Sequence, residues 1–147
     1  MKLSVQEAAL GSYTDIYRLT AAQITALGTG NQVTVGKVAA GGIVTNATVY
    51  EITTSAGTST DLVLDVGTTT ADPDEYIDAL NLTTLTKVAF CTGDAYTSGG
   101  DAGTLNGAIN NTTGDLDIKA EVNFTGTVTG GEWLIALNIL NPGDLAS

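Results

Sequence analysis

The ten residues from Asp115 to Phe124 alternate strictly between polar and apolar side chains. The apolar members are Leu116, Ile118, Ala120, Val122 and Phe124, and every residue between them is polar or charged. Because successive side chains of a β-strand point to opposite faces, this order predicts a strand with one buried face and one solvated face.

The composition extends this expectation to the whole chain. Threonine, which is β-branched and costly in helices, is the commonest residue, and 18 glycines accompany only 14% charged residues. A length of 147 residues is typical of one domain. Seven or eight short predicted strands favour an all-β fold: an antiparallel β-sandwich, most simply a jelly roll, with one or two very short helices. We expect an N-terminal arm at 1–13 and one sandwich domain at 14–147.

Periodicity and turn residues place the other elements. Further strands are predicted at 14–19, 32–38, 43–52, 61–66, 86–91 and 131–140. The turn at 40–42 suggests that 32–38 and 43–52 form a hairpin. Thr20 and Gln23 have capping-box spacing for one or two helical turns that end at Gly28. The polar stretch 92–114 is predicted to be a long loop, of the kind that is usually functional or mobile.

The strand at 131–140 is apolar on both faces. Such a strand either lies centrally in a tightly packed sandwich or meets another subunit. Its residues Trp133, Ile135, Leu137 and Ile139 are therefore interface candidates, as are Leu3 and Val5 of the arm, which we expect to order on a partner.

The segment 72–78 reads as a short acidic helix. Asp72 would be its N-cap and Pro73 its first residue, with Asp74 and Glu75 facing the positive end of the helix dipole. The same carboxylates suggest a cation site formed by Asp65, Asp72, Asp74 and Asp78. Capping explains them more simply, and their spacing does not match an EF-hand loop, so no metal is expected.

Charge and missing residue types argue against several functions. The net charge is −11 and the five cations are scattered, so binding to nucleic acid or to an anionic membrane surface is not expected. No apolar run is long enough to span a membrane. The chain has no histidine, and Cys91 is its one cysteine. The carboxylates Asp115, Asp117 and Glu121 fit a solvated strand face better than a glycosidase pair. We expect no enzyme activity and no cofactor.

One ordered motif resembles a known class of proteins. Asp65-Val-Gly67 followed by Asp72-Pro-Asp-Glu-Tyr-Ile-Asp78, and preceded by the segment 41–52, is similar to small β-sandwich structural proteins of tailed-phage virions. The resemblance covers roughly residues 33–90 and the final strand at 131–140. Its specific part is the DVG and DPD motif.

The resemblance implies a capsid decoration (cement) protein without enzyme activity. Such a protein binds the outside of the phage head, bridges subunits of the major capsid protein and often forms a homotrimer. It would be made in the host cytoplasm and end on the virion surface. Two alternatives remain: another virion part (tail, adaptor or head fibre), and a carbohydrate- or surface-binding β-module, for which glycan retention through exposed tyrosines would be the test.

Overall fold

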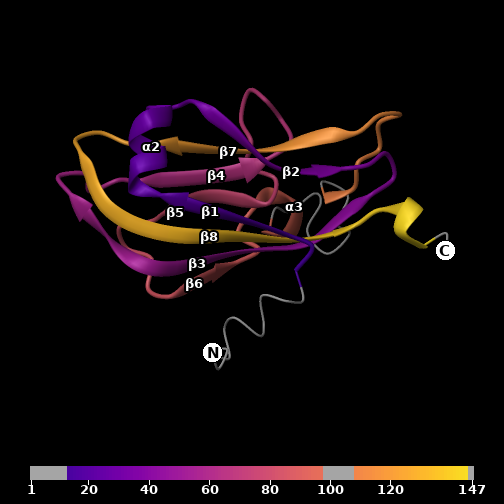
Figure 1. The fold of residues 1–147 in the computed structure, drawn as a ribbon. Coiled ribbons are helices and arrows are strands. Elements are labelled where there is room, and N and C mark those ends of the chain that lie inside the picture. The colour runs from indigo at the N-terminus through magenta and orange to yellow at the C-terminus, as the bar shows by residue number, and fades with distance from the viewer. Residues whose placement is uncertain (1–12, 98–107, 146–147) are drawn as a thin grey trace.

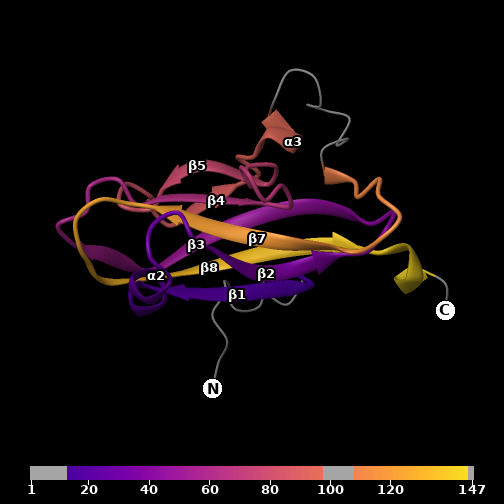
Figure 2. The same cartoon turned by 90° about the horizontal axis from the view of Figure 1, so that it is seen from above.

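The computed structural model describes residues 13–97 and 108–145, which form two four-stranded antiparallel sheets packed face to face (Figures 1 and 2). In spatial order, sheet A consists of β1 (Asp15–Thr20), β8 (Val128–Leu140), β3 (Ile43–Gly57) and β6 (Val88–Phe90). Sheet B consists of β2 (Gln32–Val38), β7 (Leu116–Asn123), β4 (Val63–Gly67) and β5 (Ile77–Asn81). The predicted all-β sandwich is confirmed.

The strand pairing is that of a jelly roll. Each strand of the first half of the chain pairs with its mirror image in the second half: β1 with β8, β2 with β7, β3 with β6, and β4 with β5. The additional pairs β3–β8 and β4–β7 complete the two sheets. Consecutive strands alternate between the two sheets except at the central hairpin, β4–β5, which lies within sheet B.

The predicted hairpin between 32–38 and 43–52 is wrong. Both segments are strands, but β2 belongs to sheet B and β3 to sheet A. The turn between them is tight, with Gly42 N–H donating to Ala39 O at 2.8 Å. Residues from distant parts of the chain fix its ends, because Ala39 N–H donates to Asn141 Oδ1 and Gly41 N–H donates to Asn110 O. The turn therefore carries the chain from one sheet to the other.

The short helix predicted after β1 is confirmed. Helix α2 (Ala21–Leu27) begins at Thr20, whose hydroxyl accepts from Gln23 N–H while the Gln23 side chain accepts from Thr20 N–H. Gly28 follows with a φ of 83° and donates its N–H to Ile24 O. With Ile24 buried, α2 lies at one end of the sandwich, where the chain passes from β1 to β2 (Figure 1).

The acidic segment 72–78 is not a helix, which corrects the sequence-based prediction. Tyr76 N–H donates to Val66 O at 2.9 Å, and Ile77 begins β5. Both Tyr76 and Ile77 are buried. Pairing with Val66 of β4 fixes Ile77 in the core, and Tyr76, just before β5, is buried as well. The burial of these two large side chains outweighs the capping signature of the preceding aspartates.

The predicted loop at 92–114 is described at its two ends. It begins with the short helix α3 (Asp94–Thr97) and ends near Ile109, which forms an isolated bridge with Ile43. Asn110 is buried, and its amide donates to Val38 O and Gly114 O. Residues 98–107 lie outside the described part, as do residues 1–12 of the predicted arm. A 3-10 turn, η2 (Pro142–Leu145), follows β8.

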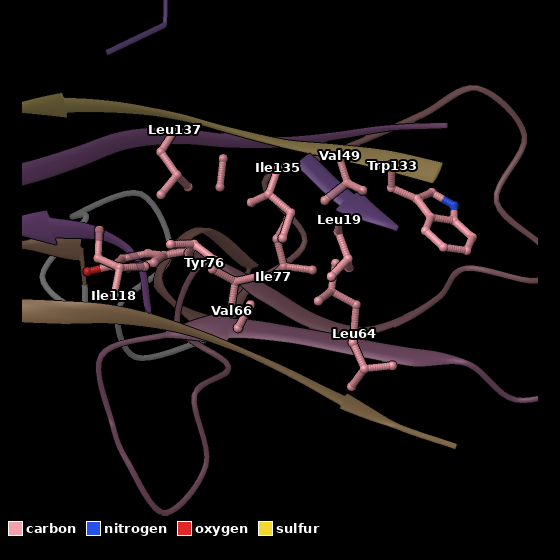
Figure 3. Close-up of a cluster of buried hydrophobic side chains, with 14 of the residues drawn as sticks. Leu19, Val49, Leu64, Val66, Tyr76, Ile77, Ile118, Trp133, Ile135 and Leu137 are labelled. Carbon is pink, nitrogen blue, oxygen red and sulfur yellow. The ribbon is translucent and has the colours of Figure 1, made fainter. Parts of the chain in front are cut away.

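The core lies between the two sheets (Figure 3). The alternation in β7 has the predicted result, since Ile118, Ala120 and Val122 are buried. In β4, Leu64 and Val66 are likewise buried, as is Leu62 just before it. Sheet A contributes its inward-facing side chains, listed here: Leu19, Val49, Trp133, Ile135, Leu137 and Ile139.

Neighbouring positions of β7 provide a test of this arrangement. Ile118→Ala should lower the free energy of unfolding by about 2–5 kcal/mol, because it leaves a cavity between the sheets. Asp117→Ala, on the solvated face, loses one exposed ion pair with Lys119 and should cost less than about 1 kcal/mol. Urea denaturation followed by tryptophan fluorescence measures both, and equal costs would contradict the register.

Candidate functional site

The outer face of sheet A carries two rows of side chains that run across all four strands. In the first row Ile16, Ala136, Thr48 and Phe90 lie opposite one another on successive strands. The second row, one step along, is Arg18, Leu134, Tyr50 and Val88. Residues between the rows, such as Ile135 and Val49, point into the core. We call the eight residues of the two rows the apolar face.

The apolar face exposes large hydrophobic side chains. Phe90 is 60% exposed, Val88 49% and Ile16 45%. Leu140, which precedes the turn η2 and points to the same side, is also exposed. Single exposed apolar residues are ordinary, but a contiguous group across one sheet is typical of a protein-contact surface.

Tyr13 lies across the middle of this face. The backbone of the next residue is bound to β8, since Thr14 N–H donates to Leu137 O at 3.0 Å. The Tyr13 hydroxyl is on β3, 2.8 Å from Thr48 Oγ1 and 3.4 Å from Tyr50 Oη. The Tyr13 side chain therefore spans β8, which accounts for the complete burial of the outward-facing Ala136.

The two tyrosine rings meet edge to face, with centroids 6.5 Å apart and planes at 81°. The hydrogen bond with Tyr13 and partial burial raise the pKa of Tyr50 to about 12. Tyr50 therefore adds no charge to the apolar face near pH 7.

Arg18 is the one charged residue in the two rows. It lies at their β1 end and forms an ion pair with Glu132. Arg18 donates to both carboxylate oxygens of Glu132, at 2.5 and 3.0 Å. This pairing raises the pKa of Arg18 and lowers the pKa of Glu132. The pair is exposed, so it contributes little stability, but it neutralises the rim of the apolar face beside β1.

The outer face of sheet B has the opposite character. Asp65 lies opposite Glu121, and Lys37 lies opposite Asp117, next to Lys119. Asp78 lies on β5 of the same sheet, and further acidic residues occupy the segments beside it: Asp61, Asp72, Asp74 and Asp115. We call this side the acidic face. The two outer faces of the sandwich thus differ in chemistry: one is apolar and nearly neutral, and the other is strongly anionic.

The four aspartates proposed from the sequence as a cation site belong to the acidic side. Asp65 Oδ1 accepts from Ala79 N–H at 2.6 Å. Burial, and then the neighbouring carboxylates, raise the pKa of Asp65, Asp74 and Asp78. Within the ranges that the structure describes, no group of three or more histidine, cysteine or carboxylate side chains is placed to hold a metal ion.

Glu75 has a different role from the predicted helix-dipole contact. Its Oε2 accepts from Thr68 N–H at 2.9 Å, and its Oε1 accepts from Thr69 N–H at 3.1 Å and from the Thr69 hydroxyl. The carboxylate thereby closes the loop between β4 and β5. A side chain at Gly67 would collide with Glu75, which explains the glycine of the DVG motif.

The interface candidates from the last strand are buried inside the single chain. Trp133, Ile135, Leu137 and Ile139 point between the sheets and are at most 4% exposed. A contact with a second subunit through these side chains would require the sandwich to open. The exposed surface of sheet A is instead on its opposite side. Leu3 and Val5 lie outside the described residues.

Sequence reasoning did not single out Tyr13, Val88 and Phe90 as residues of the outer surface of sheet A. It placed Tyr13 at the end of an arm and predicted a strand at 86–91. A signal was present, because the segment 88–90 is apolar on both faces although its strand is very short. A short edge strand with large apolar side chains on both sides must expose one of them unless a partner covers it.

A second apolar feature lies near α2. A shallow hollow of about 320 Å³ is lined by Tyr17, Leu19, Gln23, Ala26, Leu27 and Val33. It lies between β1, α2 and β2, which supply these residues. Among the helices that the structure describes, none is long and apolar enough to cross a membrane.

Comparison with known proteins gives one structural match. A solved structure described as the cyanophage Pam1 capsid asymmetric unit aligns with a TM-score of 0.55 at 16% sequence identity. The alignment covers 87% of this chain and 83% of the other. At this identity the match shows a shared fold over most of both chains. No known family model matches the sequence, and neither does any curated protein.

The loop closed by Glu75 allows a stability test with a matched control. Glu75→Gln should destabilise the fold by about 1–3 kcal/mol, because its NH₂ group would face a backbone N–H that now donates to an oxygen. Asp72→Asn should be neutral or stabilising, since Asp72 only raises the pKa of neighbouring carboxyls. Urea denaturation compares the two, and an equal loss in both variants would contradict this role of Glu75.

The raised pKa values predict that acid stabilises the fold. The pKa is raised for Asp15, Asp65, Asp74 and Asp78, with burial as the largest cause. The native state then binds protons more readily than the unfolded chain, so stability is lost as pH rises through the raised values. The free energy of unfolding should therefore increase as pH is lowered from about 7 toward about 4.5.

Urea denaturation at fixed ionic strength measures this slope. Asp65→Asn keeps an oxygen for Ala79 N–H and should reduce the slope. A stability that falls over the same range would contradict the expectation. The lowered pKa of Glu132 acts in the opposite direction, but only at more acidic pH.

Proposed function

We propose that this protein is a structural component of a phage virion, and specifically a non-enzymatic decoration protein of the head. It would bind the outside of the shell and stabilise contacts between subunits of the major capsid protein. The observation that carries this proposal is the jelly-roll match to a phage capsid structure over most of both chains. The DVG and DPD motif, chosen from the sequence alone, points to the same class of proteins.

The difference between the two outer faces supports an orientation on the shell. The apolar face, with Phe90, Val88 and Ile16 exposed, would dock against the capsid, and the acidic face would point to solvent. Removing a large apolar side chain from water contributes about 1.5–3 kcal/mol, so a few such contacts per copy give modest affinity. A copy that contacts two adjacent shell subunits gains further affinity through avidity.

A homotrimer is the favoured assembly, because a decoration protein at a local three-fold axis bridges three shell subunits at once. The net charge of −11 does not prevent it if the acidic faces stay on the outside. The apolar face would then occur three times on the side of the trimer that meets the capsid. The major capsid protein is the partner, and no nucleic acid, membrane or cofactor is involved.

Counting copies tests the proposal directly. Quantitative mass spectrometry of purified particles should find this chain at a simple fraction of the major capsid protein. A few copies per particle would place it in the tail, adaptor or a head fibre, and absence from particles would refute a virion role.

A binding assay then tests the docking face. Shells stripped of this chain should bind Phe90→Ser about tenfold or more weakly than the unaltered protein, because about 1.4 kcal/mol of burial is tenfold in affinity. Asp117→Ala, on the acidic face, is the matched control and should bind normally. Equal affinity of both variants would exclude the apolar face as the docking surface.

A further inference from the structure

We propose that Ile52 of one copy inserts into the hollow beside α2 of the next copy, and that three copies joined in this way close into a ring. The inference deepens the proposed homotrimer and rests on the proposed function for the number of copies. The contact itself belongs to the isolated chain, so it can be tested without a phage shell.

Ile52 is an exposed apolar side chain at an irregularity of sheet A. It is 53% exposed. Glu51 and Thr53 of β3 pair with the consecutive residues Trp133 and Glu132 of β8, so Ile52 is the extra residue of a β-bulge. The extra residue of a bulge is left unpaired, and bulges redirect side chains beside functional surfaces. Ile52 is therefore available to a partner and lies outside the two rows of the apolar face.

The hollow supplies a matching pocket. Its volume is about 320 Å³, at the lower limit of small-ligand sites, which span about 300–1,000 Å³. Leu19, Leu27 and Val33 give it an aliphatic lining, and none of its lining residues is charged. A space of this size and chemistry suits one aliphatic side chain. An apolar side chain that fits a pocket elsewhere on the same molecule produces a head-to-tail contact between copies.

Ile52 and the hollow lie on opposite edges of sheet A. The pairing of β6 with β3 ends at Tyr50, so among the described strands β3 forms the edge of the sheet at Ile52. The hollow lies at the other edge, beside β1. Leu19 of the hollow, Trp133 and Glu51 are opposite one another on β1, β8 and β3, so both patches are at the same level along the strands.

This placement suits a closed ring. Helix α2 and the end of β3 occupy the same end of the sandwich, which would lie nearest the ring axis (Figure 1). Both patches adjoin sheet A, so an axis perpendicular to this sheet brings them together without a step along the axis. A head-to-tail contact without such a step closes into a ring, whereas one with a step grows into a filament. The ring also keeps the apolar faces of all copies on one side, as docking on a shell requires.

The charge pattern of the chain favours contact between these two patches. The net charge is −11, so most contacts between two copies bring like charges together. Residues 20–36, which contain α2 and most of β2, include no charged side chain and form the longest uncharged run of the chain. Residues 52–60 are uncharged as well. A second copy therefore meets little repulsion when the end of β3 approaches the hollow.

Disulfide trapping in the full-length protein tests the contact, because a disulfide forms only between Cβ atoms about 4 Å apart. Cys91→Ser removes the native thiol, and Ile52→Cys and Ala26→Cys, in the hollow lining, are then introduced singly and together. The proteins are oxidised and separated on non-reducing gels. We expect the double variant to give a covalent trimer without free thiols, several-fold more abundant than any covalent oligomer of either single variant. A mixture of the two single variants should give a covalent dimer.

Three outcomes would overturn the proposal. A double variant that forms no more covalent oligomer than the single variants would show that Ile52 and the hollow do not meet. A product that stops at the dimer would show a reciprocal pair of copies. A ladder of longer products without a closed trimer would show an open chain.

Sedimentation velocity provides an independent measurement on the isolated protein. Ile52→Ser and Ala26→Glu should each weaken self-association by about tenfold or more, because each removes the apolar contact. Phe90→Ser is the matched control, since it removes a similarly exposed apolar side chain from the apolar face and should leave self-association unchanged. Circular dichroism verifies the fold of each variant. If Phe90→Ser abolishes self-association and Ile52→Ser does not, the copies meet through the apolar face and the proposal fails.

The two proposals fail separately. Normal binding of Ile52→Ser to stripped shells, together with a failed trapping experiment, would refute the ring and leave the decoration role intact. Trapped trimers of a chain that is absent from particles would refute the virion role and leave the contact intact.

Discussion

The central position of β8 is the constraint on which the rest of the structure depends. This 13-residue strand pairs with β1 on one side and with β3 on the other, so it joins the beginning, the middle and the end of the chain. Its inward side chains, from Trp133 to Ile139, fill one side of the core (Figure 3). Because these pairings link residues at least 71 positions apart, sheet A gains its stability only when the whole chain has folded.

The central position of β8 also determines the chemistry of the outer surface of sheet A. A strand in the middle of one sheet of a two-layer sandwich buries one row of side chains and turns the other row outward. In β8 the outward row contains Leu134 and Ala136, which are apolar like the inward row. The sequence pattern of 131–140, apolar on both faces, therefore has two separate causes: the core on one side, and the apolar face, partly covered by Tyr13, on the other.

The sequence predicted individual strands better than their pairing. The alternation in 115–124 and the capping box at Thr20 are local, and both elements lie where expected. The hairpin at 32–52 failed because Ala39–Gly42 has residues typical of any tight turn, whether it stays in one sheet or crosses to the other. At the crossing Gly41 N–H donates to Asn110 O and Ala39 N–H donates to Asn141 Oδ1, about 70 and 100 residues away, and no local pattern encodes these bonds.

The acidic segment shows why a strong local signal can mislead. Asp72 to Glu75 has the residues of a helix start, but Glu75 closes the preceding loop instead, and Tyr76 and Ile77 enter the core. Burying two large side chains contributes more than a cap of about 1 kcal/mol. The motif that prompted the comparison with virion proteins is thus a loop closure, in which Gly67 provides the space and Glu75 the acceptor atoms.

Charge distribution explains how so acidic a chain can keep one outer face nearly neutral. Most of the negative side chains that the structure describes belong to sheet B and the segments beside it, and two sheets about 10 Å apart separate them from the apolar face. At physiological ionic strength the Debye length is about 8 Å, so this charge is largely screened on the far side of the sandwich. The acidic face opposes stacking of copies through sheet B, and the apolar face remains available for association. The two outer faces of the sandwich are therefore not equivalent. The apolar face can be buried against another surface at little electrostatic cost, whereas the acidic face must stay hydrated.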